Sequence, residues 1–223
     1  MTLDEVIILL KSAESVDALI ERTEDILELF PVLKRAVGYN QNNKAHQYDL
    51  YEHSLHTVIN LPRGIDDDML YLAALLHDVG KPDCRTIGYK DGKLNCHYYG
   101  HPVRSEEIVQ QEVIPFLEIN GEILSHEDKK ILLYYVRHHD DHMSLRIKYL
   151  REHLSHINME QFKNLMLLEV ADAKAHVVFD KIQRRIDVCE QLSGDYADFL
   201  LLELINNDKK QGIHTNIKGF TPI

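Results

Sequence analysis

The sequence has few of the features that mark secreted, membrane-spanning or zinc-ribbon proteins. Only 3 of its 223 residues are cysteines, and Cys84, Cys96 and Cys189 show no CxxC spacing. An odd number of widely spaced cysteines indicates a reducing compartment and gives no thiolate zinc site. No apolar run approaches the roughly 20 residues that a membrane-spanning helix needs. The first residues, Met1 to Glu5, lack the basic segment of a signal peptide. We therefore expect a cytoplasmic protein with no membrane partner.

Basic residues are also in the minority. Lys and Arg number 25 against 36 Asp and Glu, which gives a formal net charge of -11. Such a surface does not attract long nucleic acid as a whole. Small phosphorylated substrates remain compatible with it, because a bound divalent cation reverses the local field. Histidine is abundant, with 14 residues, and it is both a common metal ligand and a proton carrier. The sequence does not indicate an oligomeric state.

Helical periodicity dominates the chain. Apolar residues recur at i, i+3 and i+4 in the segments 2–11 and 15–30. The segment from Met69 to about Val79 is almost continuously apolar, which predicts a central buried helix, and Gly80 is a normal helix end. Further helices are expected over about 49–60, 103–118, 125–137, 144–154 and 196–206, with one long helix, broken at most once, from Met159 to Leu192.

One segment departs from this pattern. Between residues 85 and 99, an Asp-Gly pair lies between two short β-prone runs, which is typical of a hairpin. There is no internal repeat and no linker. We therefore predict an all-α fold, a helical bundle with this one small β-hairpin, in a single domain that spans residues 1–223. Its core is expected over about 46–180, with N-terminal helices over 1–45 and a C-terminal helix and tail over 194–223.

The first candidate for chemistry is the pair His77-Asp78 at the end of the buried helix. Two ionisable side chains follow ten mainly apolar residues there. An unpaired buried carboxylate costs several kcal/mol, so Asp78 is expected to be paired or bound to a metal. The alternative is an ordinary helix end with an exposed acid.

Asp172 and His53 are the other two candidates. Asp172 falls in the apolar stripe of its helix, so it points toward the core and needs a cation or several donors to stay ionised. The alternative is a salt bridge to an arginine such as Arg137 or Arg104. His53 lies on a helix with mixed apolar positions, and by itself it could equally be a core or surface histidine. The apolar stripe around Asp172 consists of Leu165, Leu168, Ala175 and Phe179.

Taken together, these residues resemble the ligand pattern of the HD superfamily. A histidine is followed about 24 residues later by His-Asp, and then by an aspartate near the end of a helical domain. From about residue 26 to 176 the chain resembles the HD domain of bacterial tRNA nucleotidyltransferases and poly(A) polymerase-like proteins. The matching segments are Leu29–Pro31, Gln41 with His46, Asp49–Ser54, Ala73–Pro82, Tyr99–His101, Val136–His139 and Ala171–Ala173.

The resemblance has a limit. Those larger enzymes add nucleotides with a separate N-terminal domain that carries a Gly-Ser motif and paired aspartates. Residues 1–45 of this sequence instead show two amphipathic helices. Nucleotide addition is therefore not expected, and the metal-binding HD chemistry is.

The resemblance implies a metal site with His53, His77, Asp78 and Asp172 as ligands. HD proteins with two metals place extra histidines where this chain has His101 and the pair His138-His139, so one or two ions are expected. The alternative is that His101 contacts a substrate phosphate and that the histidine pair is exposed. Imidazole with carboxylate suits Mn, Fe, Co, Ni or Zn, with Mg as a weaker alternative.

The resulting hypothesis is a metal-dependent phosphohydrolase that acts on a small phosphoester, with a nucleotide favoured, through a metal-bound hydroxide. The reaction could be that of a phosphomonoesterase, a nucleotidase or a 2',3'-cyclic phosphodiesterase. Asp78, Lys81 and His101 are the predicted catalytic residues, and Lys81, Arg104 and His46 the predicted substrate contacts, although each of these three could be an ordinary surface residue. The alternatives are an HD-fold di-iron oxygenase and a non-catalytic metal- or nucleotide-binding regulatory module.

Overall fold

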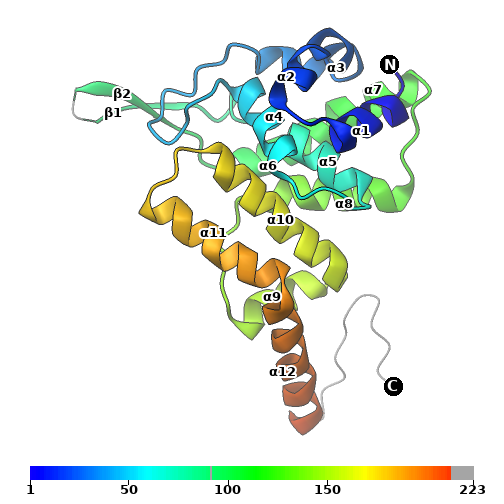
Figure 1. Cartoon of the computed structure of the whole chain (residues 1–223), viewed down its shortest axis with the longest axis vertical. Helices are drawn as coiled ribbons and strands as arrows, with labels where there is room; N and C mark the ends of the chain where they lie inside the picture. The colour runs from blue at the N-terminus through cyan, green and yellow to red at the C-terminus, as the bar shows by residue number, and fades with distance from the viewer. Residues whose placement is uncertain (91, 212–223) are drawn as a thin grey trace.

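The computed structural model describes residues 1–90 and 92–211. Figure 1 shows a helical molecule with one small antiparallel sheet, so the predicted all-α fold with a single hairpin is confirmed. The predicted tail from 212 onward lies outside the described residues. The α-helices are α1 (Leu3–Ser12), α2 (Val16–Ile20), α3 (Thr23–Leu29), α4 (Leu50–Asn60), α5 (Asp68–Leu76), α6 (His101–Ile108), α7 (Ile114–Ile119), α8 (His126–His138), α9 (Ile147–Leu154), α10 (Met159–Ala175), α11 (Asp180–Ser193) and α12 (Asp195–Gln211).

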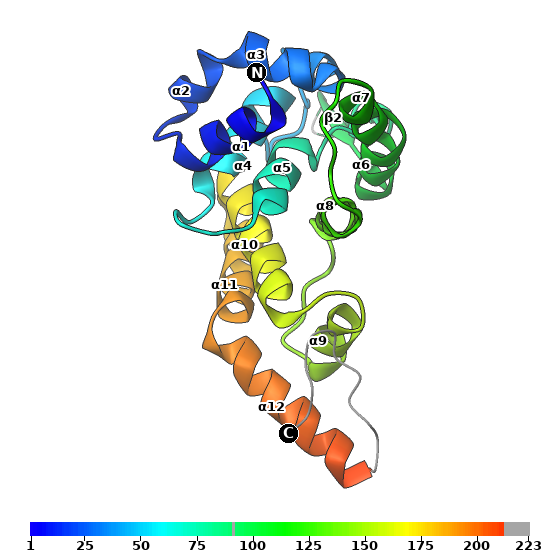
Figure 2. The same ribbon diagram turned by 90° about the vertical axis from the view of Figure 1, so that its right-hand side faces the viewer.

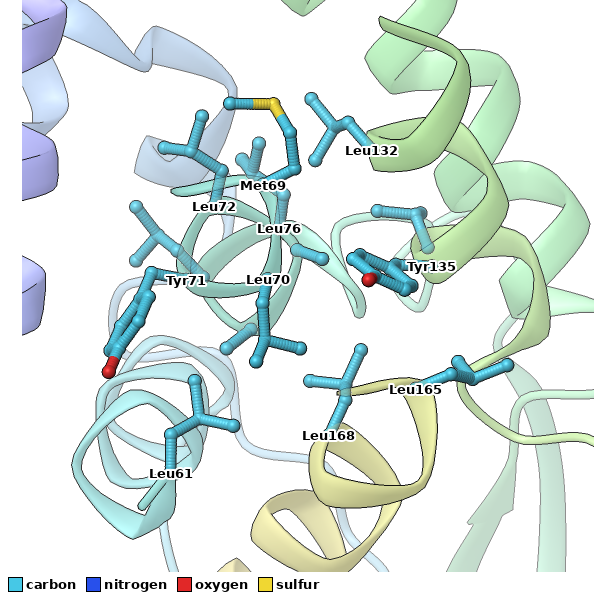
Figure 3. Packing of buried hydrophobic residues seen from close by; sticks show 14 of the residues in the cluster. Leu61, Met69, Leu70, Tyr71, Leu72, Leu76, Leu132, Tyr135, Leu165 and Leu168 are labelled. Carbon is cyan, nitrogen blue, oxygen red and sulfur yellow. The ribbon is translucent and has the colours of Figure 1, made fainter. Parts of the chain in front are cut away.

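The core is built around α5. Every residue of this helix from Met69 to Leu76 is buried, as expected for a helix that is apolar on all sides. Helices α4, α8 and α10 pack against it. Figure 3 shows α5 in the centre, with Tyr135 of α8 to its right and Leu168 of α10 below it. Because α5 is held from several sides, the residues at its C-terminal end are fixed in position.

The N-terminus of α5 is fixed by a partly buried hydrogen-bond network. Asp67 caps the helix by accepting from the backbone N–H of Leu70. Its second carboxylate oxygen accepts from the Tyr135 hydroxyl at 2.6 Å and from the Asn164 amide at 2.9 Å. These bonds tie α5 to α8 and α10, the two helices that carry further candidate site residues at or just beyond their ends.

Three predicted helices are interrupted. The segment 15–30 divides into α2 and α3, and it is followed by the short helix η1 (Pro31–Arg35). The segment 103–118 contains a π-helical turn, η2 (Val109–Val113), just before Pro115, whose missing N–H removes one backbone bond of the helix.

The long helix predicted from Met159 to Leu192 is broken once, at residues 176–179. Phe179 therefore does not continue the apolar stripe of α10. It is the N-cap of α11, and its side chain is 40% exposed. As Figures 1 and 2 show, α11 turns back along α10, and this pair leads from the upper body, which holds α1 to α8, to the lower end with α9 and α12.

The hairpin consists of β1 (Thr86–Lys90) and β2 (Lys93–His97), paired antiparallel with Thr86 opposite His97. Figure 1 shows it projecting from one side of the molecule. Its second strand leads directly to α6. The single-domain organisation stays a prediction. Within the described residues, none of the helices combines the length and the apolarity needed to cross a membrane.

Candidate metal centre

Four ligand-type side chains from three segments meet inside the molecule. His53 lies on α4, His77 and Asp78 follow the last residue of α5, and Asp172 lies on α10. Each is at most 3% exposed, so the exposed helix end considered for Asp78 is wrong. His53 Nε2 lies 2.9 Å from Asp172 Oδ1 and 3.3 Å from Asp78 Oδ2. His77 Nε2 lies 3.1 Å from Asp78 Oδ2. The four predicted ligands are thus close enough together to hold a metal ion.

A second group lies on the other side of Asp78. Its Oδ1 atom is 3.1 Å from His101 Nε2 and 3.6 Å from His139 Nε2. The Nε2 atoms of His101 and His139 are 3.2 Å apart, and both histidines are buried. The two groups therefore share Asp78, with one carboxylate oxygen directed to each. Asp78 could therefore contribute to the binding of an ion in either group.

Gly80 explains how the second group reaches Asp78. A Cβ atom at position 80 would lie 2.5 Å from the backbone nitrogen of Ser105 and 2.8 Å from the carbonyl oxygen of His101. The backbone N–H of Gly80 donates to the Ser105 hydroxyl at 2.9 Å. Because glycine has no side chain, the start of α6 can pack directly on the turn that carries Asp78, which brings His101 to the site.

The histidines are oriented by backbone carbonyl groups. The Nδ1 atom of His77 is 2.9 Å from the carbonyl oxygen of Ala74, and the Nδ1 atoms of His101 and His139 bond in the same way to residues three positions earlier in the chain. A carbonyl oxygen can only accept, so each Nδ1 carries the proton and donates it. The Nε2 lone pairs are then directed at the centre, as in metal sites whose histidines are held by a second hydrogen bond.

The side chains fit a divalent cation. Both oxygens of Asp78 and the Nε2 atom of His77 are buried and have no hydrogen bond of acceptable geometry, although other nitrogens lie near them. Buried polar atoms are normally satisfied, so lone pairs that converge without bonding to each other indicate a place for an ion. Imidazole and carboxylate ligands suit Mn, Fe, Co, Ni or Zn.

The local electrostatics keep both carboxylates ionised. Burial raises the pKa of each, but His77 holds the pKa of Asp78, and His176 that of Asp172, well below the usual range. Burial lowers the pKa of His77, but the two carboxylates outweigh this effect and raise it to about 10. A proton on His77 and a metal ion compete for the same lone pair, so metal binding is expected to release a proton.

Lys81 lies at the same centre. Its Nζ atom is 2.6 Å from Asp78 Oδ2 and 3.1 Å from the side-chain oxygen of Gln41, and the residue is 5% exposed. The alternative of an ordinary solvent-exposed lysine is therefore wrong. Gln41 is itself buried, and its backbone carbonyl accepts from the Tyr98 hydroxyl. Lys81 thus presents a fixed positive charge beside the carboxylate that the two groups share.

His46 and His176 line the wall next to His53. Their ring centroids are 4.5 Å apart, and the His46 ring lies 5.4 Å from that of His53. The three histidines form a further group with metal-ligand spacing. No motif in the sequence singles out His176, which is buried and donates from its Nδ1 atom to the Asp172 carbonyl oxygen. The i, i+4 spacing from Asp172 was the signal that could have placed it here.

Arg185 is the main residue that sequence reasoning missed. Its guanidinium lies 2.9 Å from Asp172 Oδ2, bonds to the fully buried carboxylate of Glu169, and donates to the carbonyl oxygen of His139. The arginine partners considered for Asp172 were wrong. Arg137 lies near Glu106 instead. Since α11 folds back along α10, a break placed at 176–179 would have set Arg185 opposite Asp172.

Two predicted site residues lie elsewhere. His138 is half-buried, its Nδ1 atom is 2.6 Å from Asp141, and it belongs to none of the ligand groups in the described part of the chain. Neighbouring residues on a helix point about 100° apart, so of the pair only His139 faces Asp78. Arg104 pairs with Asp83 and Glu107 and is not among the residues that line the cavity, so its role as a substrate contact stays a prediction without support from this geometry.

His138 instead lines a separate cavity of about 410 Å³ with His153. Burial lowers the pKa of His153 to about 4, and its Nδ1 atom lies 2.9 Å from the Tyr134 hydroxyl. The unfolded chain therefore binds a proton on His153 near pH 6.5 that the folded chain does not, so folding stability falls as pH drops below 6.5.

Between pH 7.5 and 5, the free energy of unfolding of the wild type should fall by about 2 kcal/mol more than that of His153→Gln, as measured by urea unfolding. The exposed His156→Gln is the control. Equal losses in wild type and His153→Gln would contradict this.

The shared carboxylate lies at the wall of an open cavity of about 540 Å³. Pockets of this size accommodate ligands as large as a nucleotide. The cavity brings the site residues together with aromatic and basic side chains from the hairpin and from the start of α11. Its lining includes His46, Asp78, Lys81, His97, Tyr99, His101, His139, Asp172, His176, Phe179, Lys181 and Arg185.

The family comparison agrees with this geometry. A family model for the HD domain matches residues 49–176, which is more than half of the chain. That range contains the two ligand groups around Asp78. No curated protein matches the chain, and the finer resemblance to tRNA nucleotidyltransferases stays a prediction. The chain belongs to the HD domain family.

Proposed function

We propose that this protein is a metal-dependent phosphohydrolase that acts on a small phosphoester. The single observation that carries the proposal is the position of Asp78, whose two oxygens face two separate ligand groups at the wall of an open cavity. Two adjacent divalent ions suit phosphoryl transfer, because both the attacking and the leaving oxygen need stabilisation. The family membership supports the same chemistry.

When bound, a divalent ion supplies a coordinated water with a pKa lowered toward about 7 and neutralises charge on the phosphoryl oxygens. His53, His77, Asp78 and Asp172 would hold one ion, and Asp78, His101 and His139 a second. The protein side chains would carry out the proton transfer and stabilise the charge on the substrate. As a ligand of that second ion, His101 Nε2 would have no free lone pair, so Asp78, whose carboxylate oxygens each keep a further lone pair, would accept the proton that an attacking water loses.

Lys81 lies beside the other carboxylate oxygen of Asp78 and would assist the same reaction. Its buried ammonium group lies 2.6 Å from Asp78 Oδ2 and is held by Gln41. A positive charge fixed in a buried site stabilises charge that develops on a phosphoryl oxygen. His46 lines the same cavity and could contact a phosphate there. The favoured substrate is a nucleotide, and the proposed location is the cytoplasm. Because the net charge of the protein is strongly negative, we do not propose a long nucleic acid as a partner.

The test is a metal-supplemented screen with the full chain. Mn²⁺, Fe²⁺, Co²⁺, Ni²⁺, Zn²⁺ and Mg²⁺ are each combined with a 5'-nucleotide, a 2',3'-cyclic nucleotide and a generic phosphomonoester, and release of phosphate or of the nucleotide product is measured. Turnover that a chelator removes supports the proposal. Metal-loaded protein without any phosphoester turnover would overturn it and favour a binding module. Iron loading with oxygen consumption would indicate the oxygenase instead.

Metal binding should also stabilise the fold. An ion that binds only the folded chain at 100 times its Kd adds about 2.7 kcal/mol. For a protein of this length, this corresponds to a rise in Tm of roughly 5 to 10 °C. Differential scanning calorimetry with and without a chelator measures it. The same change should be much smaller in His53→Ala. A Tm that is insensitive to every tested metal would argue against a preformed ion site.

A further inference from the structure

The mouth of the cavity carries two aromatic side chains that the proposed function leaves unexplained. The rings of His97 and Tyr99 are stacked, with centroids 5.4 Å apart and planes 9° from parallel. Both side chains line the cavity that also contains Asp78 and Lys81. We call His97 and Tyr99 the ring platform. It lies at the exit of β2, directly before α6 brings His101 to the site.

The platform is held in place by the hairpin. In the antiparallel register Gly88 is opposite Asn95, which lies two residues before His97, so all three residues are on the same face of the sheet. A Cβ atom on Gly88 would already contact the His97 ring at 3.7 Å and would lie 2.9 Å from the carbonyl oxygen of Asn95. The side-chain amide nitrogen of Asn95 is 3.1 Å from His97 Nε2. The ring of His97 therefore packs over a glycine and is fixed by a neighbouring amide.

Tyr99 is 77% exposed, which by itself is ordinary for one surface tyrosine. Its position distinguishes it from Tyr89 on the same hairpin, which is 76% exposed but does not belong to the cavity lining. Side chains alternate between the two faces of a strand, so Tyr89 lies on the face opposite His97. The hairpin thus provides both a placed aromatic ring and a matched control.

Another part of the cavity lining has complementary features. Phe179, at the start of α11, lines the same cavity and is 40% exposed. The ammonium group of Lys44 lies 6.0 Å from the centre of its ring, and the exposed Lys181 is also part of the lining. Aromatic faces with nearby cations at the mouth, and Lys81 with the ligand groups inside, suit a molecule with a flat ring at one end and a phosphate at the other.

We propose that the ring platform binds the base of a nucleoside phosphate by stacking, and so determines which phosphoesters the cavity accepts. This inference rests on the proposed function for the position of the phosphate. Stacking of a base on an exposed aromatic side chain is tolerant of base identity, because every base has a π face. The platform therefore selects for the presence of a base more than for its type.

The experiment compares adenosine 5'-monophosphate with ribose 5-phosphate, which lacks the base. With the metal-loaded full chain, the wild type is expected to bind the nucleotide about five- to tenfold more tightly, the effect of one stacked base at the lower end of its range. Tyr99→Ala should remove this preference, and Tyr99→Phe should keep it because the ring remains. Tyr89→Ala should match the wild type. If Tyr99→Ala weakens both ligands equally, or neither, the proposal is wrong.

Two readouts separate this inference from the proposed function. Equilibrium dialysis with metal present measures the affinities of both ligands if neither is hydrolysed, and KM values measure the preference if they are. A Tyr99-dependent preference for the nucleotide, in metal-loaded protein that hydrolyses none of the phosphoesters in the screen, would support the platform and refute the phosphohydrolase. Hydrolysis of both ligands with the same preference in wild type and Tyr99→Ala would support the phosphohydrolase and refute the platform.

Discussion

Replacing Asp78 with asparagine is expected to lower metal-dependent turnover by on the order of 10³-fold. Loss of a single electrostatic group in an active site typically costs about 10² to 10³ in kcat. Asp78 is at the upper end because one carboxylate faces both ligand groups, with Oδ2 near His77 and Oδ1 near His101. An asparagine of the same shape keeps the packing but removes the charge that both ions need.

The measurement is metal content by elemental analysis together with the hydrolysis rate on the best substrate of the screen. Asp141→Asn is the control, since this half-exposed carboxylate bonds to His138 and does not belong to the described ligand groups. It should retain both metal and activity. Circular dichroism and thermal unfolding check that Asp78→Asn is folded. If that variant keeps two ions and wild-type kcat, the shared carboxylate is not the centre of the chemistry.

The position of Asp78 is also the part of the site that the sequence predicts best. An acid after ten mainly apolar residues can be buried or can cap an exposed helix end, and burial of its charge requires a partner. The same reasoning works for Asp172, which lies in an apolar stripe. His53 could be predicted as a ligand only from the order of the motif, because a single histidine among apolar positions could equally be a core or a surface residue. The helical fold and the hairpin could be predicted because both depend on local features of the sequence, namely apolar periodicity and turn residues.

The sequence does not show contacts that depend on where one helix ends and in which direction the next one runs. The break at 176–179 has no proline or glycine, so the sequence does not locate it, and Phe179 was assigned to the apolar stripe of Asp172 although it lies at the end of the break. The same error hid Arg185, because its partner Asp172 is reached only when α11 folds back along α10. The choice between His138 and His139 stayed open for a smaller reason, since adjacent histidines at a helix end can be told apart only when the direction that each side of the helix faces is known.

Arg185 gives the second large expected effect. The guanidinium bonds Glu169, which is fully buried, and lies 2.9 Å from Asp172 Oδ2. Removing one member of a buried ion pair leaves an uncompensated charge and costs about 3 to 5 kcal/mol. Arg185→Ala should therefore lower the free energy of unfolding by about this amount. It should also weaken metal affinity about 10- to 100-fold, because Asp172 loses the partner that orients it.

The pH dependence of this loss follows from Glu169. Burial raises the pKa of the Glu169 carboxyl above its usual range, and Arg185 is the cation that opposes this. Without the arginine, the pKa rises further, so the folded variant binds a proton that the unfolded chain releases. Protonation then stabilises the folded state as pH falls. The difference in stability between wild type and Arg185→Ala should accordingly be smaller at pH 5.5 than at pH 8.

Urea unfolding at both pH values and metal titration measure these effects. Arg185→Lys keeps the charge but not the forked geometry, so it should lie between wild type and alanine and gives a readout if Arg185→Ala does not fold. The neighbouring Arg184 is exposed and donates to the carbonyl oxygen of Asp180, so Arg184→Ala serves as the matched control with a change below about 0.5 kcal/mol. If Arg184→Ala and Arg185→Ala lose the same stability and metal affinity, Arg185 does not hold Asp172 in place, and the carboxylate must be oriented by the histidines alone.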